Sequence, residues 1–407
     1  MQSIKSKWLI VIVLFIYTLI IIIPPIAHGY IYPNGGDDSA GHLYYLTKYV
    51  NRDISIVGLA NSYWGQVIVG VPIMALHKGF GWSIDTMFLW FNYLVLWGVG
   101  ISVYLLVGKV VGWKIGLISI PIVMFISASV LNLFNDGSIY DLMTVGVLLP
   151  LSIFALLSSL KNKKWLIIAG VFILLAVIVH SAAVFKRYGL VPQPSTPISD
   201  FLTIMVGGLL LVLLIIAVVF LIIDKYKYEK NEKIAASILG ILIVLFIPLS
   251  FTQITVWANR FAVDLAIIIG IFTALVVGMV LKRIGLRPSA FITLGVVAFS
   301  LPLIVNWLGY NSAVKEVDKE VISYVNSMPG DTFSCSSTIN PLIYGRFLNK
   351  TYVNGTLPYI DRDKPMTSGT TLGSKYYYWY TKMEPIELNS EITKTFSDGN
   401  VNVEVLQ

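Results

Sequence analysis

The sequence predicts a polytopic, all-α membrane protein of about nine transmembrane helices, followed by a small extracytoplasmic α/β domain. Of its 407 residues, 56% are hydrophobic and only 13% are charged, whereas soluble chains carry about 25% charged residues. Mean hydropathy is +0.78. Apolar runs of about 20 residues, each long enough to cross a bilayer, recur from residue 8 to residue 308. This composition excludes a water-soluble multidomain protein.

The predicted spans cover residues 8–27, 84–107, 112–133, 139–160, 164–184, 199–223, 234–252, 261–281 and 288–308. A shorter apolar run over 66–76 suits a re-entrant or interfacial helix. Counting that run as a span would place the cluster Lys161–Lys164 outside the cell. The first segment has the basic start of a signal peptide, but its apolar run is too long and no cleavage pattern follows it. We therefore expect an uncleaved first span.

The charges indicate an orientation. With the N-terminus in the cytoplasm, 14 of the 29 basic residues fall in cytoplasmic segments, six in outer loops and nine in the tail. Only three acids, Asp224, Glu229 and Glu232, are then cytoplasmic. The net charge of +7 therefore reflects topology, and we expect no nucleic-acid partner. The expected location is the plasma membrane of a prokaryotic cell, with the C-terminal domain outside.

The tail predicts a domain over 309–407, after a transmembrane module over 1–308. An apolar stripe at helical spacing runs from Val314 to Met328. Short strands follow, and Ser397–Asn400 is a turn composition that leads into an alternating strand over 401–405. The single cysteine, Cys335, excludes a disulfide within the chain.

The first outer loop, 28–83, carries the most informative motif. Asp37 and Asp38 are expected just before a helix over 39–50, in which Asp38 and His42 lie one turn apart on one face. An acid and an imidazole could then act at one point as catalytic groups. The alternative is that one aspartate merely caps this helix, which is a common role for Asp.

A second acidic group lies between the third and fourth spans. Asp136 belongs to an Asn-Asp-Gly-Ser stretch, and this composition is equally typical of a solvated turn. Asp141 enters an apolar run, where an ionisable side chain is costly and usually functional. Either residue could support the first-loop acids or bind a metal ion.

Basic side chains occur at the predicted outer boundary. His180 ends the fifth span, and Lys186 and Arg187 follow it. Arg260 stands at the outer start of the eighth span and is the only basic residue in its loop. These groups could bind a lipid phosphate, because arginine suits bidentate phosphate recognition. His180, Lys186 and Arg187 could equally be interfacial anchors.

This order of features resembles the GT-C superfamily of membrane glycosyltransferases, which includes oligosaccharyltransferase catalytic subunits, protein mannosyltransferases and aminoarabinose transferases. The resemblance rests on the acidic first loop Gly36–His42, the proline-bearing apolar helix around Pro72, and Gly108–Gly112 at the end of the second span. The acidic loop around Asp136 and the C-terminal domain complete it. It lies in architecture and order more than in identity.

The resemblance implies transfer of a sugar from a polyprenyl-phosphate or polyprenyl-diphosphate donor to a lipid, glycan or protein acceptor, usually with inversion. A first-loop aspartate, here Asp37 or Asp38, would be the general base. The family sometimes uses a divalent cation, Mg²⁺ or Mn²⁺, held by second-loop acids, so a cofactor is left open. No Trp-Trp-Asp motif occurs in the tail, which favours single-sugar transfer over en bloc transfer of an oligosaccharide.

Two other functions compete with this interpretation. A flippase or transporter would use intramembrane acids as ion sites, but transporters usually show repeated halves. A noncatalytic membrane scaffold would tolerate substitution of Asp37, Asp38 and His42.

Overall fold

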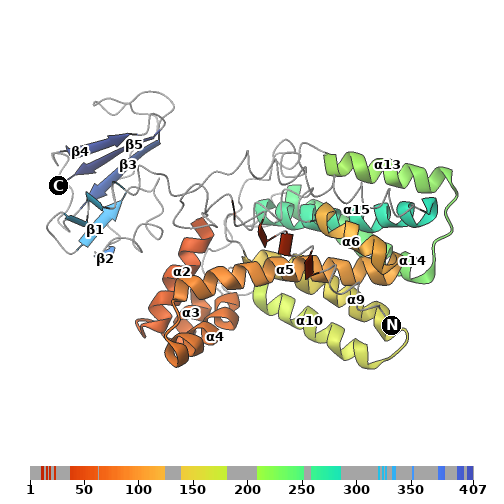
Figure 1. Ribbon diagram of the computed structural model, residues 1–407, viewed down its shortest axis with the longest axis horizontal. Helices are drawn as coiled ribbons and strands as arrows, with labels where there is room; N and C mark the ends of the chain where they lie inside the picture. Colours follow the sequence, from red (N-terminus) through yellow and green to blue (C-terminus); the bar gives the residue numbers. More distant parts are fainter. Residues whose placement is uncertain are drawn as a thin grey trace. The chain divides into compact units, whose positions relative to one another are not determined.

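The computed structural model of the chain describes residues 37–62, 64–123, 139–180, 209–251, 258–285, 332–335, 351–352, 375–380, 392–397 and 401–406, with scattered positions in 11–23 and 320–327. The chain divides into two compact units (Figure 1). Unit 1 comprises Met1–Ile26 and Tyr45–Tyr310, and unit 2 comprises Ala27–Tyr44 and Asn311–Gln407.

Most of the described helices fall within the predicted apolar runs, whereas two lie in the segment between the first run and the run at 66–76. The described helices are α2 (Asp37–Val50), α3 (Ile56–Ser62), α4 (Trp64–Phe80), α5 (Ile84–Val111), α6 (Trp113–Pro121), α8 (Ile139–Asp141), the π-helix η2 (Leu142–Leu148), α9 (Leu149–Ser159), α10 (Lys164–His180), α13 (Leu209–Ile223), α14 (Lys230–Phe251) and α15 (Ala258–Ile284). The segments α8, η2 and α9 form one continuous rod. A helix is confirmed over the predicted run 66–76, and it extends further, as α4 over Trp64–Phe80; its re-entrant or interfacial placement stays a prediction.

Four helical segments in the described residues are long and apolar enough to cross a membrane: Thr86–Val111, Ile139–Ser159, Lys230–Phe251 and Phe261–Ile284. Helices α10 and α13 are apolar but shorter in their described extent. The predicted span 288–308 and most of 8–27 lie outside the described residues. The membrane-helix character is therefore established, and the number of nine spans stays a prediction.

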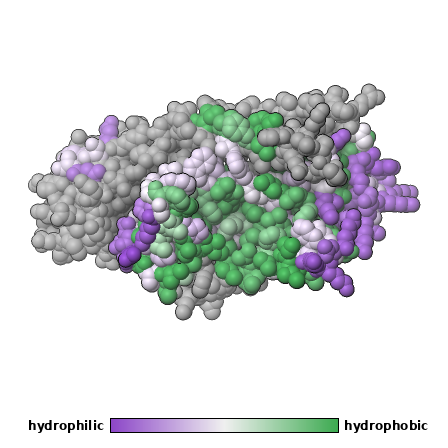
Figure 2. All heavy atoms as spheres, turned by 60° about the horizontal axis from the view of Figure 1, so that its bottom comes forward, coloured by the Kyte–Doolittle hydropathy of each residue, from purple (hydrophilic) through white to green (hydrophobic). Residues whose placement is uncertain are grey.

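Apolar side chains cover much of the outer surface of unit 1. Ile167 in α10, Ile223 in α13 and Val244 in α14 are 73%, 76% and 67% exposed. Figure 2 shows hydrophobic residues gathered across one face, with hydrophilic residues at its margins. Exposure of such area is unfavourable in water but costs nothing in lipid. These helices therefore have the surface that a bilayer requires.

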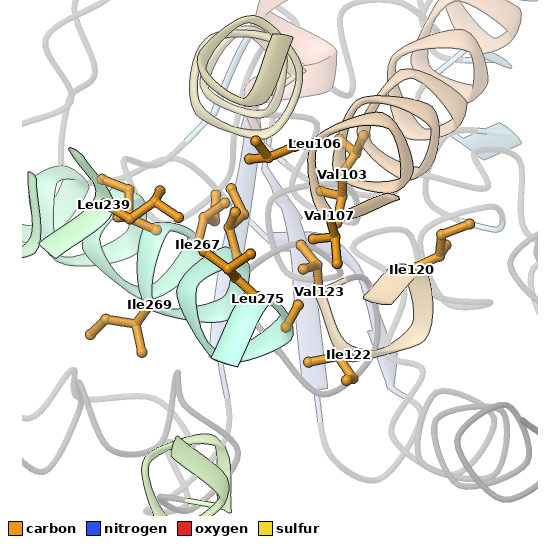
Figure 3. Close-up of a cluster of buried hydrophobic side chains, with 14 of the residues drawn as sticks. Val103, Leu106, Val107, Ile120, Ile122, Val123, Leu239, Ile267, Ile269 and Leu275 are labelled. Atoms are coloured by element: carbon orange, nitrogen blue, oxygen red, sulfur yellow. The ribbon is translucent and has the colours of Figure 1, made fainter. Parts of the chain in front are cut away.

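The core of unit 1 is built around α5, α6, α14 and α15 (Figure 3). Val107, Ile120, Leu239 and Leu275 are buried there. The most apolar stretch of α15 is 78% buried, against 17% for α14. α15 is thus a central helix, and α14 a peripheral one.

Glycines bring α5 and α6 into close contact. A Cβ atom on Gly116 would lie 3.0 Å from the backbone N and Cα of Gly108 and 3.0 Å from the carbonyl oxygen of Tyr104. Gly112 joins the two helices with φ of +112°, a conformation that other residues rarely adopt. The predicted Gly108–Gly112 motif is thus part of a tight helical hairpin.

Three helices of unit 1 finish at the same end. A Cβ on Gly278 of α15 would lie 3.0 Å from Val111 at the end of α5. The Nζ atom of Lys109 lies 5.8 Å from the ring centroid of Phe154 in α9. We call this end of unit 1, where α5, α9 and α15 finish, the lysine end. Helices α10 and α14 start there and run back toward the opposite end.

Unit 2 contains a five-stranded mixed sheet in the order β2-β1-β3-β5-β4. Its strands are β1 (Thr332–Cys335), β2 (Thr351–Tyr352), β3 (Lys375–Tyr380), β4 (Ile392–Ser397) and β5 (Val401–Leu406). β4 and β5 pair antiparallel, with Ser397 opposite Asn402, as the predicted turn at 397–400 requires. The helix predicted from Val314 lies mostly outside the described residues, so the α/β character and outer location of this domain stay predictions.

Candidate functional site

Helix α2 carries the acidic motif and begins at Asp37. The sequence placed both aspartates just before a helix over 39–50, but the structure includes them in the first turn. Negative charge is favourable there, because the helix dipole is positive at this end. Both interpretations of the two aspartates, catalytic group and helix cap, stay predictions. Asp38 and His42 remain one turn apart on one face.

The second half of α2 is held by α3 and α4. A Cβ on Gly70 of α4 would lie 2.9 Å from Leu46 in α2 and 2.8 Å from Leu59 in α3. Leu46 and Leu59 are fully buried, and Tyr49 and Val50 are also buried. The apolar stripe of α2 thus anchors its C-terminal half. Asp37, Asp38 and His42 lie in its N-terminal half, which belongs to unit 2.

Asp141 is buried at the start of the rod formed by α8, η2 and α9. Its side chain is only 4% exposed, and the helix changes to π geometry directly after it, over Leu142–Leu148. The hydroxyl of Ser102 in α5 lies 2.8 Å from the carbonyl oxygen of Gly146 in η2. Short π segments are frequent at functional sites. The burial of Asp141 agrees with its expected place in an apolar run, and its functional role stays a prediction.

Asp264 is a buried acid that the sequence analysis did not single out. It lies in α15, one turn after Arg260, and is 2% exposed. The signal was present in the sequence, since this aspartate interrupts an otherwise apolar run from Phe261 to Val277. The same reasoning that selected Asp141 would have selected it.

Together with Asn92, which is 1% exposed, these two acids define what we call the buried polar layer. A Cβ on Gly146 would lie 2.8 Å from Val99, so Asp141 and Asn92 both lie about two turns or less before this contact. Asp264 lies about four turns before Gly278. The layer therefore lies toward the end of unit 1 opposite the lysine end.

The other predicted site residues are only partly described. Arg260 lies in the first turn of α15, and His180 is the last residue of α10, so the structure brings their backbones to the same end of unit 1 as Asp141. Asp136, Lys186 and Arg187 lie outside the described residues. Within the residues that the structure describes, no group of three or more His, Cys, Asp or Glu side chains could hold a metal ion.

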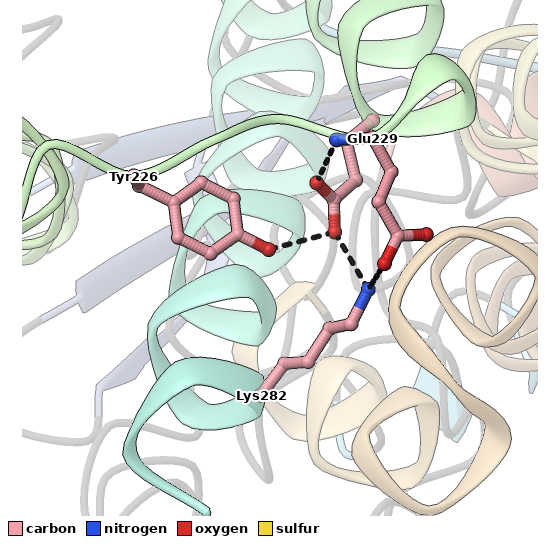
Figure 4. A network of polar contacts seen from close by, with 4 residues as sticks. Tyr226, Glu229 and Lys282 are labelled. Atoms are coloured by element: carbon pink, nitrogen blue, oxygen red, sulfur yellow. Dashed lines mark hydrogen bonds and ion pairs between the residues drawn. The ribbon is translucent and has the colours of Figure 1, made fainter.

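An ion-pair network occupies the lysine end (Figure 4). Glu232 is fully buried. Its Oε2 atom accepts a hydrogen bond of 2.7 Å from the backbone N of Glu229. Its Oε1 atom accepts bonds of 2.8 Å from the Tyr226 hydroxyl and 3.0 Å from Lys282 Nζ. Lys282 also pairs with Glu229 at 2.6 Å.

This network joins the α13–α14 loop to the end of α15. Arg283 adds a second link, donating from Nε to Asp224 Oδ2 at 2.6 Å. Burial, followed by the hydrogen bond to the Glu232 carboxylate, raises the pKa of Tyr226 to about 12. Tyr226 therefore stays protonated at neutral pH and remains a donor. The network is structural in character, because every acid in it is already paired with a cation.

Neither the comparison with protein-family models nor that with curated proteins finds a match for this chain.

Proposed function

We propose that this protein is an integral-membrane glycosyltransferase of the GT-C type, which moves a sugar from a polyprenyl-phosphate donor to an acceptor, with a first-loop aspartate as general base. The observation that supports it most is helix α2, whose first turn carries Asp37 and Asp38, with His42 one turn after Asp38. The location of buried acids toward one end of the apolar bundle also supports it.

The proposed reaction forms a bond between an acceptor oxygen and the anomeric carbon of the sugar. The bond from that carbon to the lipid phosphate breaks, and the phosphate departs with the electron pair. The acceptor proton passes to the carboxylate of Asp37 or Asp38, a role that a positioned carboxylate fulfils within hydrogen-bond reach. Arg260 is proposed to stabilise charge on the departing phosphate. A phosphate leaving group needs no general acid.

The test is transfer of a radiolabelled sugar from a polyprenyl phosphate in proteoliposomes. We expect Asp37→Asn or Asp38→Asn to lower the rate about 10²–10⁴-fold, since general-base catalysis contributes on that order. Asp53→Asn is the matched control, because Asp53 is exposed in the turn after α2 and should leave transfer unchanged. Full activity of both single variants and of the double variant would remove the general-base assignment.

A flippase or ion-coupled transporter is the second candidate, and the buried carboxylates of Asp141 and Asp264 favour it. The same proteoliposomes distinguish the two functions. A transferase converts the label into a new glycoside, whereas a transporter moves the intact lipid-linked sugar to the other leaflet. Repeating the assay in excess EDTA, then adding Mg²⁺ or Mn²⁺, tests the divalent cation.

A further inference from the structure

Exposed lysines gather at the lysine end of unit 1, and seven of them cluster around the α9–α10 turn and the α13–α14 loop. We call them the basic face, and they are Lys161, Lys163, Lys164, Lys225, Lys227, Lys230 and Lys233. Lys161 and Lys163 lie in the turn between α9 and α10, and Lys164 is the first residue of α10. The others lie in the α13–α14 loop and the first turn of α14. In Figure 2 hydrophilic residues concentrate at the margin of the apolar surface.

These lysines are not neutralised by the acids nearest to them in the chain. Asp224 pairs with Arg283, and Glu229 and Glu232 pair with Lys282. Both cations come from the end of α15, so these three acids are already paired with that helix. Among the described residues, no ion pair involves any lysine of the basic face. Their positive charge is therefore available to groups outside the protein.

The position of the basic face, just beyond the exposed apolar end of α13, indicates what it binds. Ile222 and Ile223, at the end of α13, are 67% and 76% exposed, as hydrocarbon contact requires. Lys225 follows two residues later, and Tyr228, three residues further along the chain, is 40% exposed. Tyrosine is typical of the layer between hydrocarbon and water. The lysines therefore lie where the headgroups of a bilayer begin.

We propose that the basic face binds the phosphate groups of anionic phospholipids in the leaflet at the lysine end. Clusters of lysine directly beyond a membrane helix attract anionic headgroups, and this attraction is screened by salt. Because Lys282 and Arg283 pair with the neighbouring carboxylates, those carboxylates do not neutralise the lysines of the basic face. This inference is independent of the proposed transferase activity.

The experiment measures which lipids surround the full-length protein in phosphatidylcholine vesicles that contain a minority of phosphatidylglycerol. Spin-labelled phosphatidylglycerol and phosphatidylcholine report the motionally restricted lipid at the protein surface. At low salt we expect restricted phosphatidylglycerol to exceed phosphatidylcholine by about fivefold for each lysine that engages a headgroup. Replacing Lys225, Lys227, Lys230 and Lys233 by glutamine should lower this preference strongly.

The matched control replaces the same four lysines by arginine, which keeps the charge and should keep the preference. High salt should abolish it in the wild-type protein. Absence of a preference in the wild type, its persistence in high salt or in the glutamine variant, or its loss in the arginine variant would each overturn the proposal. If inorganic phosphate competes more strongly than chloride at equal ionic strength, the face is a soluble-anion site instead. The wild-type measurements remain decisive if the glutamine variant does not fold.

Discussion

Glu232 shows how a charged side chain is accommodated without any exposure to solvent. It is the third residue of α14, and its carboxylate reaches back to the backbone N of Glu229, just before the helix. This is the contact that glutamate makes at the same position of a capping box. Lys282 and Tyr226 supply the remaining donors. A buried carboxylate is costly unless it is paired and hydrogen-bonded, and both conditions hold here.

Replacing Glu232 by alanine should therefore destabilise the protein. The change leaves Tyr226, Lys282 and the Glu229 amide without their common acceptor, and we expect a loss of about 2–3 kcal/mol. Thermal unfolding in detergent, followed by circular dichroism, measures it. Glu229→Ala is the matched control, because that side chain is 64% exposed and should cost less than about 1 kcal/mol. Equal effects of both changes would contradict the role given to Glu232.

Deprotonation of Tyr226 should make the stability contributed by this network fall at alkaline pH. Its pKa rises from the ordinary value of 10.0 to about 12 in the folded protein, so the folded state holds the phenolic proton more tightly than the unfolded state. The stabilisation is complete below pH 10 and is lost as the pH rises through about 12. Tyr226→Phe should remove this part of the pH dependence.

Two measurements follow that prediction. The difference in tyrosinate absorbance between wild type and Tyr226→Phe should show one late-titrating tyrosine among the 22 in the chain. The difference in unfolding midpoint between the two proteins should shrink over the same alkaline window. A difference titration centred at the ordinary tyrosine pKa would mean that the hydrogen bond to Glu232 does not form.

At the level of elements, the contact between α5 and α6 depends on the absence of side chains. A methyl group on Gly116 would press against backbone atoms of Gly108 and Tyr104, and backbone cannot move aside as a flexible side chain can. We expect Gly116→Ala to destabilise unit 1 by about 1–3 kcal/mol, in the range found for overpacking.

Gly240→Ala provides the matched control for Gly116→Ala. Gly240 also lies inside an apolar helix, α14, but nothing lies within 4 Å of its Cβ position. This substitution should be neutral or stabilise by about 0.5–1 kcal/mol, because alanine has the higher helix propensity. Unfolding of both variants in the same detergent tests the contrast. Similar behaviour of the two would show that α5 and α6 are not in close contact.

The positions of the elements were largely predictable, whereas their contacts were not. Apolar runs revealed α5, α14 and α15 because a span needs an uninterrupted apolar stretch. The π geometry of η2 and its contact with α5, where the Ser102 hydroxyl meets the carbonyl oxygen of Gly146, could not be inferred from the sequence. The pairing of Glu232 with Lys282 joins residues 50 positions apart. Such contacts become visible only when the helices are placed side by side.

For the candidate site, the sequence indicated which residue types are involved but not how deeply each side chain is buried. Asp37 and Asp38 stood out because they are adjacent and precede an apolar stripe, although the start of α2 was placed two residues late. Asp264 was overlooked because it has no charged neighbour beyond Arg260 to draw attention to it. Its burial follows from the central position of α15, which packs against α5, α6, α13 and α14.

For the molecule as a whole, the two ends of unit 1 should face opposite sides of the membrane. Helix α5 separates them, and its 28 residues span about 42 Å. Lys78 lies shortly before the start of α5, and Asn162 lies in the turn that follows α9. After Cys335 is replaced by serine, cysteines at positions 78 and 162 should therefore label from opposite sides, with position 162 cytoplasmic.

Membrane-impermeant maleimide, applied to intact cells and to inverted vesicles, measures this. Labelling of position 162 from outside the cell would reverse the predicted orientation. Labelling of both positions from the same side would mean that α5 does not cross the membrane.

The glycine contact between α5 and α6 also bears on the order in which the protein is assembled. Gly108 and Gly116 are close in the chain, so their contact requires only the short closure at Gly112, and closures of low sequence separation are the fastest to form. The α5–α6 hairpin can thus pack as soon as both helices have left the ribosome. Helix α15, synthesised much later, then finds a preformed surface at Val107, Val111 and Ile115 for its own Gly278.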